Sequence, residues 1–232
     1  MFFGKMKAVT FSYDDGVTQD IRLIEMFNKY GLKCTFNLNS GLLGKEGILV
    51  REGKEVFHNK VQPEDVPAIY EGHEVAAHTL THPSLLKLTD SEITSQVEND
   101  RLALSELVGY EVVGMAYPGG GTNFDRRVST VVKETTGIKY ARTIISTKDF
   151  EPQTELYEFK PTCYHHVDFD KMFDLAETFI NMKPQTPRVF YIWGHSYEFD
   201  INDTWDRMEQ FCKLISGHSD IYYGTNKDIL LK

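Results

Sequence analysis

Two neighbouring aspartates, Asp14 and Asp15, end an apolar run and are followed at once by Gly16 in the segment FSYDDG. Adjacent carboxylates repel each other, so a strand end is a costly place for them unless a cation binds there. The segment HTLTH contains His78 and His82, four residues apart, a spacing that paired metal ligands use. Two histidines and one carboxylate, with positions left open to water, are typical of a catalytic metal site. We therefore predict that one aspartate binds a divalent metal ion together with His78 and His82, and that the other has a different role.

Two further motifs supply the remaining groups for hydrolysis of an amide or an ester. Attack by a metal-activated water needs a base, and the second aspartate is suited to that role. The oxyanion that forms needs hydrogen-bond donors, and the segment YPGGG offers the unhindered backbone amide of Gly119. The leaving amine needs a proton, which His195 of the segment WGHS is placed to give. The residues therefore predict metal-assisted hydrolysis.

Strand-like and helix-like runs alternate along the chain, which predicts one α/β domain over residues 1–232. Strands are expected at 6–13, 33–38, 74–79, 112–117, 139–144, near 156–161, 188–193 and 220–224. Helices are expected at 20–30, 62–72, 89–109, 124–136, 169–182 and 204–217, with a final helical turn. Residues 41–62 interrupt this rhythm and are interpreted as an inserted hairpin that turns at Glu52–Gly53. About seven β–α units favour a closed or nearly closed barrel, whose functional groups belong at the carboxyl ends of the strands, where the four motifs stand.

Composition and charge narrow the class of partner. The formal net charge of -9 and the pI of about 5.4 argue against nucleic acid and against an anionic membrane, because both need a basic surface. The cysteines Cys34, Cys163 and Cys212 are few and widely spaced, so we expect reduced, buried thiols. The first residues contain no apolar core of signal-peptide length, and no apolar run approaches the length of a membrane span. We therefore expect a cytoplasmic protein with no membrane partner, and the sequence predicts no particular oligomeric state.

The four motifs resemble those of the NodB-homology polysaccharide deacetylases, the fourth family of carbohydrate esterases. SYDDG is similar to the family's first motif, HTLTH to its second, AYPGG to its third and IWGH to its last, in the family's order. The resemblance implies a distorted seven-stranded (β/α) barrel. It implies that Asp14 is the general base and His195 the general acid. It assigns the metal to Asp15, His78 and His82.

Two departures from the family pattern affect the base and the acid. The arginine of the third motif, which pairs with the base, is replaced by Ala116, and we expect Arg142 on the next predicted strand to reach the same place. The family's Asp–Trp element, whose aspartate supports the acid, has no match. The candidates for that support are Asp149, Asp168, Glu198 and Asp200.

The resemblance implies removal of an acetyl group from an N-acetylated sugar or oligosaccharide, with one divalent metal ion as cofactor. We expect zinc, although an Asp/His/His set also accepts cobalt, nickel or iron. Aromatic side chains near the motifs suit the face of a sugar ring. The expected substrate-binding residues are Tyr117, Pro118 and Trp193. Further candidates for the cleft are Tyr164, His165, His166 and the segment SYEFD (196–200), which contains Tyr197. The lack of an export signal argues against cell-wall peptidoglycan as the substrate and favours a small intracellular N-acetylated sugar or glycoside. Two alternatives stay open, namely hydrolysis of a small non-sugar amide and an inactive barrel that binds carbohydrate.

Overall fold

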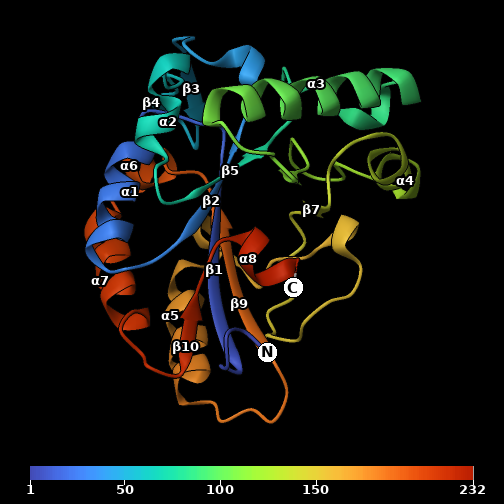
Figure 1. The fold of residues 1–232 in the computed structure, drawn as a ribbon. Coiled ribbons are helices and arrows are strands. Elements are labelled where there is room, and N and C mark those ends of the chain that lie inside the picture. The colour runs from blue at the N-terminus through green and yellow to red at the C-terminus, as the bar shows by residue number, and fades with distance from the viewer. Residues whose placement is uncertain (232) are drawn as a thin grey trace.

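The computed structural model describes residues 1–231 and is built around one parallel sheet (Figure 1). The strands of this sheet lie in the spatial order β7 (Tyr140–Arg142), β6 (Gly114–Ala116), β5 (Glu74–Ala77), β2 (Cys34–Leu38), β1 (Lys7–Asp14), β9 (Arg188–Gly194) and β8 (Cys163–Tyr164). The short strand β10 (Ile221–Tyr223) pairs with the first residues of β1, outside this order. The sheet curls into a distorted seven-stranded half-barrel, which confirms the predicted fold class.

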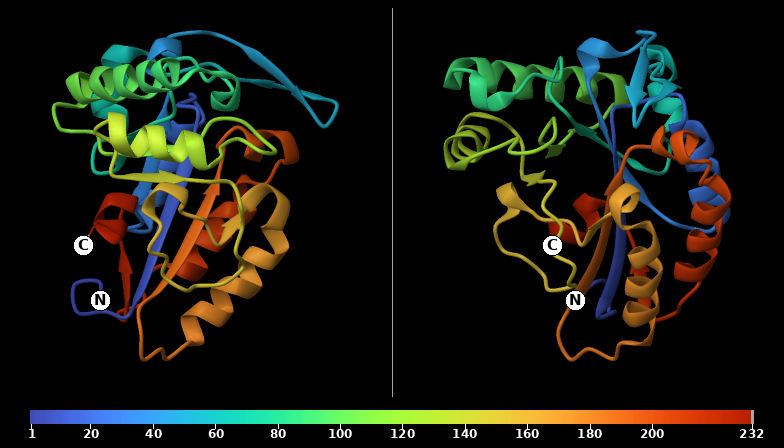
Figure 2. Two further views of the ribbon diagram at one scale, coloured as in Figure 1. Left: turned by 90° about the vertical axis from the view of Figure 1, so that its right-hand side faces the viewer. Right: turned by 180° about the vertical axis from the view of Figure 1, so that it is seen from behind.

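Most helices pack against the outer face of the curled sheet, and the short helix α8 (Asn226–Leu230) lies on its inner side (Figure 2). The others are α1 (Asp20–Lys29), α2 (Val66–Ile69), α3 (Asp90–Val108), α4 (Arg126–Thr135), α5 (His165–Asn181), α6 (Glu198–Asn202) and α7 (Trp205–Ile215). The longest, α3, begins with a capping box of Thr89 and Glu92 and ends at Gly109, whose φ of 74° is the left-handed conformation that glycine favours. No helix within residues 1–231 is both long and apolar enough to cross a membrane.

Strand β1 shows how the sheet separates two environments. Val9, Phe11 and Tyr13 are buried in the large apolar cluster that includes side chains of α1, α5 and α7 on the convex face. The alternate residues face the concave side, because successive side chains of a strand point in opposite directions. There Thr10 donates to the amide oxygen of Asn226 in α8, at 2.9 Å. The concave face thus carries buried polar pairs as well as a small apolar cluster around Ala8 and Tyr191, and its upper end is the carboxyl end of the strands.

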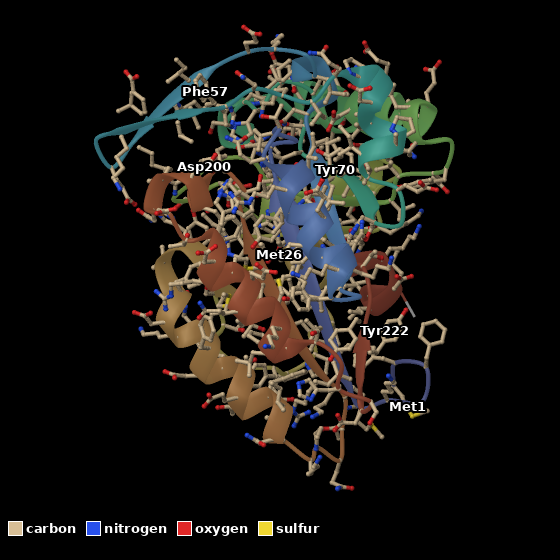
Figure 3. The ribbon with its side chains drawn as sticks, turned by 90° about the vertical axis from the view of Figure 1, so that its left-hand side faces the viewer. Met1, Met26, Phe57, Tyr70, Asp200 and Tyr222 are labelled. Carbon is tan, nitrogen blue, oxygen red and sulfur yellow. The ribbon has the colours of Figure 1, made fainter. Side chains whose placement is uncertain are left out.

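The segment expected as an insertion forms the antiparallel hairpin of β3 (Ile48–Arg51) and β4 (Lys54–Phe57). Glu52 and Gly53 both have positive φ, 54° and 73°, as a two-residue hairpin turn requires. The hairpin extends sideways from the body of the molecule in Figure 2. In Figure 3, Phe57 of the hairpin lies above Asp200 of α6.

Two expected elements differ from the structure. The strand expected near 156–161 is wrong, because Leu156–Glu158 is a 3₁₀ helix and the strand lies later, at Cys163–Tyr164. Pro161 lacks the N–H that a ladder position needs, and only Phe159 of this segment makes an isolated bridge, to Arg142. The helix expected from residue 169 begins at His165, and Asp168, with φ -110° and ψ 22°, is a kink inside it. Helix α6 was not predicted. The three cysteines are buried and unpaired, as expected.

Candidate active site

The four motifs meet at one cavity of about 390 Å³ at the carboxyl ends of the strands. Its lining includes most of the residues predicted for the site: Asp14, His78, His82, Tyr117, Gly119, Trp193 and His195. It also includes Tyr164 and Tyr197, the neighbouring glycines Gly120 and Gly121, and two residues that were not predicted for the site, Arg51 and Ile144. The other predicted site residues, Asp15, Pro118 and Arg142, are not among the lining residues. Segments far apart in the sequence therefore converge as the strand-end argument required.

The side chains of Asp15, His78 and His82 offer ligand atoms that all lie within 4.8 Å of one another. The Nε2 atoms of both histidines are 3.9 Å from Oδ1 of Asp15. Nδ1 of His78 lies 2.9 Å from the carbonyl oxygen of Ala116 and donates its proton there. This hydrogen bond leaves the lone pair of Nε2 directed at the centre, a common arrangement for metal-binding histidines. Two imidazole nitrogens and one carboxylate oxygen fit a divalent ion such as zinc.

The backbone around this centre is held in unusual conformations. Asp15, Thr79 and His82 have φ values of 86°, 68° and 58°, in the left-handed region that residues other than glycine avoid. Each such residue costs on the order of 1–3 kcal/mol and persists only where its surroundings fix it. Asn39 is one such support, because its amide donates to the carbonyl oxygens of His78 and Thr79 at 2.6 and 2.8 Å. The histidine loop is thus held in place by the segment that follows β2.

Asp15 has two basic neighbours that no motif indicated. Nε2 of His58 lies 3.1 Å from Oδ2 of Asp15, on the opposite oxygen from the two candidate ligands. Lys60 donates to the Asp15 carbonyl oxygen at 2.6 Å, and its Nζ is 3.7 Å from Oδ1. Burial raises the pKa of Asp15, but the His58 hydrogen bond and the Lys60 charge outweigh it and hold the pKa well below its ordinary value. Asp15 is therefore a carboxylate, the form that binds a metal.

Asp14 is paired with Arg142, as predicted from the missing motif arginine. Ala116 of β6 and Arg142 of β7 lie opposite each other in the register of these two strands. The guanidinium of Arg142 therefore comes from the strand next to the one that carries the family's motif arginine. Nη2 of Arg142 donates to both carboxylate oxygens of Asp14, at 2.6 Å to Oδ1, and the guanidinium side chain is fully buried. Asn37 donates to the same Oδ1 at 2.8 Å. Oδ2 lies 3.9 Å from Nε2 of His78, so this carboxylate borders the candidate metal centre.

His195 is held by Glu198, one of the four carboxylates considered for that role. Nδ1 of His195 lies 3.1 Å from Oε1 of Glu198, and the His195 backbone N–H donates to Oε2 at 3.1 Å. Burial lowers the pKa of His195, but the Glu198 carboxylate outweighs it and raises the pKa above its ordinary value. Burial also raises the pKa of Glu198, whereas the charges of His195, His165 and Arg51 bring it to about 2. The three other candidates are engaged elsewhere: Asp149 with the Glu151 N–H, Asp168 with Lys148, and Asp200 with Trp205 and Gln19.

The aromatic side chains differ in what they offer to a ligand. Tyr164 and Trp193 stack on each other with ring centroids 4.1 Å apart and form one wall of the cavity. Tyr117 also lines it, but its hydroxyl is used by a bond to the Tyr157 carbonyl oxygen at 2.8 Å. His165 does not line the cavity, because it is buried between the rings of Tyr13 and Phe199. His166 lies outside it as well and contacts Glu52 at 2.7 Å.

Comparison with known families supports this reading of the motifs. The family model described as polysaccharide deacetylase matches residues 4–141, more than half of the chain. The chain belongs to the polysaccharide deacetylase family. A peptidoglycan-N-acetylglucosamine deacetylase of Listeria monocytogenes is 24% identical over 148 residues, which cover 62% of this chain and 27% of the relative. A peptidoglycan-N-acetylglucosamine deacetylase of Bacillus cereus is 27% identical over 104 residues, 44% of this chain and 32% of the relative. The chain thus spans about a third or less of the length of these curated relatives.

Solved structures of this deacetylase family share the fold. A family 4 carbohydrate esterase from Streptomyces lividans matches with a TM-score of 0.56 at 14% identity, over 95% of this chain and 92% of that one. A peptidoglycan N-acetylglucosamine deacetylase matches with a TM-score of 0.57 at 17% identity, over 99% and 90%. A pseudoenzyme of the same esterase family from Bacillus anthracis matches with a TM-score of 0.52 at 17% identity, over 97% and 66%. The fold therefore accommodates active and inactive members, and activity has to be argued from the side chains.

Sequence reasoning from the family motifs missed three basic side chains near the cavity, namely Arg51, His58 and Lys60. All three lie in the inserted segment 41–62, which has no place in the motif order. The one available signal was composition, since REGKEVFHNK brings several basic residues into an otherwise acidic chain. The insertion therefore contributes to the site and is more than an addition to the barrel.

Proposed function

We propose that the protein is a metal-dependent hydrolase that removes the acetyl group from an N-acetylated sugar or oligosaccharide. One observation carries this proposal. Asp14, which is paired with Arg142, and His195, which is paired with Glu198, line the same cavity beside the Asp15/His78/His82 centre. Such a set provides a base, an acid and a cation binding site together, as amide hydrolysis requires.

Asp15, His78 and His82 would hold the metal ion, with zinc as our first choice. Their donor atoms and the hydrogen bond that sets the tautomer of His78 fit such an ion. When bound there, a divalent ion would polarise the acetyl carbonyl and make water a better nucleophile. The identity of the ion depends on availability as well as on this ligand set.

Asp14 is the base in this proposal. Arg142 and Asn37 both donate to its Oδ1, which fixes the plane of the carboxylate beside the centre. The buried guanidinium compensates the carboxylate charge, so that the ionised group is available to take a proton from the attacking water. Because Arg142 also lies over the ring of Trp193, with Cζ 4.4 Å from the centroid, the pair is held from two sides.

His195 is the acid, and it protonates the amine that leaves. The Glu198 carboxylate lies beside Nδ1 of the ring and accepts from the His195 backbone N–H, so the opposite ring nitrogen is left for the substrate. The raised pKa keeps the proton on His195 at a higher pH than an isolated histidine would allow. Gly119 lines the same cavity, and its backbone amide would stabilise the oxyanion.

The substrate class is supported by the relatives, which are named as peptidoglycan-N-acetylglucosamine deacetylases. Tyr164 and Trp193 both line the cavity, and because Trp193 lies between Tyr164 and Arg142, an N-acetylhexosamine ring would meet the edge of this stack. A decayed site that only binds carbohydrate is disfavoured, because both aspartates and all three histidines of the motifs are present.

The test is acetate release from N-acetylglucosamine oligomers and peptidoglycan fragments. The protein is treated with a chelator and then supplied with zinc, cobalt, nickel or iron(II). We expect acetate release only after metal is restored. We also expect the variants Asp14→Asn and His78→Ala to lose this activity. If the metal-loaded protein releases no acetate from these substrates, the proposal is wrong.

A further inference from the structure

The inserted hairpin places one charged side chain inside the candidate active site. Strand β3 alternates, with Ile48 and Val50 exposed by 58% and 70%, while Leu49 and Arg51 face the body of the protein. Arg51 is one of the residues that line the cavity. It is the only charged residue that the hairpin, residues 48–57, contributes to that lining.

The guanidinium of Arg51 joins three groups around the acid. Nη1 lies 2.9 Å from Oε1 of Glu198 and donates to the Tyr197 hydroxyl at 3.1 Å. Nη2 donates to the Tyr164 hydroxyl at 2.8 Å, and that hydroxyl donates in turn to Oε1 of Glu198. An arginine presents its donors in a rigid planar fork, so three partners fix its orientation. The ion pair is well shielded, because the side chain of Glu198 is fully buried.

Glu198 needs a neighbouring cation whose charge stays the same throughout the reaction. A buried carboxylate without a partner is costly, and removing one member of such a pair leaves an uncompensated charge. His195 cannot serve throughout, because it gives up its proton in the proposed reaction. His165 lies 3.5 Å from Oε2, but burial lowers its pKa to about 4, so it is neutral near pH 7. Arg51 stays charged at every step, since an arginine does not lose its proton in proteins.

The hairpin is docked independently of this ion pair. Lys54 donates to the Ile201 carbonyl oxygen at 2.7 Å, and Glu52 contacts His166 at 2.7 Å. Val56 packs with Tyr197 and other apolar residues in a small separate cluster. Removal of the guanidinium can therefore be separated from undocking of the hairpin.

We propose that Arg51 is a positioning residue for the general acid: it holds Glu198 in place and charged, and Glu198 holds His195. This inference rests on the proposed deacetylase function. It predicts that the loss of Arg51 impairs the step in which the leaving group is protonated. Hydrolysis that needs no such proton should suffer much less.

The test compares two substrates of the zinc-loaded chain of residues 1–232. Triacetylchitotriose has an amine leaving group that must be protonated, whereas 4-nitrophenyl acetate loses a phenolate that leaves without a proton. In Arg51→Ala, we expect the ratio of amide to ester kcat/KM to fall by about 10²-fold, the usual worth of general acid catalysis. Arg51→Lys, which keeps the charge but not the fork, should recover part of this ratio. The ratio does not depend on the fraction of protein that is folded, so an unstable variant still gives an answer.

Lys54→Ala is the matched control, because it weakens docking of the same hairpin without touching Glu198. It should leave the ratio within about threefold of wild type, well below the general acid effect. Equal losses on the two substrates in Arg51→Ala, or the same selective loss in Lys54→Ala, would overturn the inference while the proposed function stands. A wild-type protein that releases no acetate from the sugar would overturn the function and this inference with it.

Discussion

The buried pair of Asp14 and Arg142 leads to a quantitative prediction for stability. Arg142→Met keeps an unbranched side chain but removes the bonds to both carboxylate oxygens and the contact with Trp193. It leaves Asp14 as a buried charge with no cation in place of Arg142. Removal of one partner from a buried pair costs about 3–5 kcal/mol. For a domain of this size, about 2–4 °C per kcal/mol converts this into a fall in Tm of roughly 6–20 °C.

The assay is urea and thermal unfolding of chelator-treated protein, so that no metal charge compensates Asp14. The double variant Asp14→Asn/Arg142→Met should be more stable than Arg142→Met alone, because no charge is then left unpaired. Arg127→Met is the matched control, since Arg127 pairs with Asp90 at 2.7 Å in an exposed position. It should change stability by about 1 kcal/mol or less. If Arg142→Met costs no more than Arg127→Met, or the double variant is less stable than the single one, the reasoning fails.

Three further predictions concern the metal centre and the acid. Asp14→Asn should keep the metal and lose on the order of 10²-fold in rate, whereas Asp15→Asn should bind metal weakly and regain rate with excess ion. Metal content and turnover are measured for both variants. If Asp14→Asn is the variant that loses metal, the two roles are reversed. His58→Gln removes the basic partner from Oδ2 of Asp15 and should weaken metal binding by about 10–100-fold, the usual effect of a group behind a ligand; an unchanged affinity in a competition titration would contradict this. Glu198→Gln removes the carboxylate that raises the pKa of His195, so the alkaline limit of amide hydrolysis, where the acid loses its proton, should move to lower pH. An unmoved limit in the profile of kcat/KM against pH would show that another group sets it.

The central residues of the site could be predicted because the ends of the strands can be recognised in the sequence. An apolar run that stops at Asp14, and another that stops at His195, mark the edge of a parallel sheet where side chains converge. The contact of Arg142 with Asp14 was predictable for the same reason, since the missing cation had to come from a neighbouring strand end. Local patterns and the general geometry of the fold were sufficient for these residues.

Other parts required the folded chain. Glu198 could not be chosen from sequence, because four carboxylates were available and only the turn into the unpredicted helix α6 brings this one under His195. Arg51 and His58 lie on an insertion whose direction depends on how it docks, and no periodic pattern encodes that. The strand misplaced near 156–161 failed because the segment crosses from one edge of the sheet to the other, where few ladder bonds constrain it.

The side-by-side pairing of Ala116 and Arg142 bears on how members of this family are sorted into active and inactive proteins. A comparison that aligns the third motif alone finds alanine where the cation should stand and would class this chain as defective. The cation is retained in space, carried by the neighbouring strand at the same height. Loss of a motif residue therefore does not by itself show that the cation is missing from a parallel sheet, because an adjacent strand can deliver the same group to the same point. Surveys for degenerate members need to ask whether the charge is present beside the base, whatever position in the alignment supplies it.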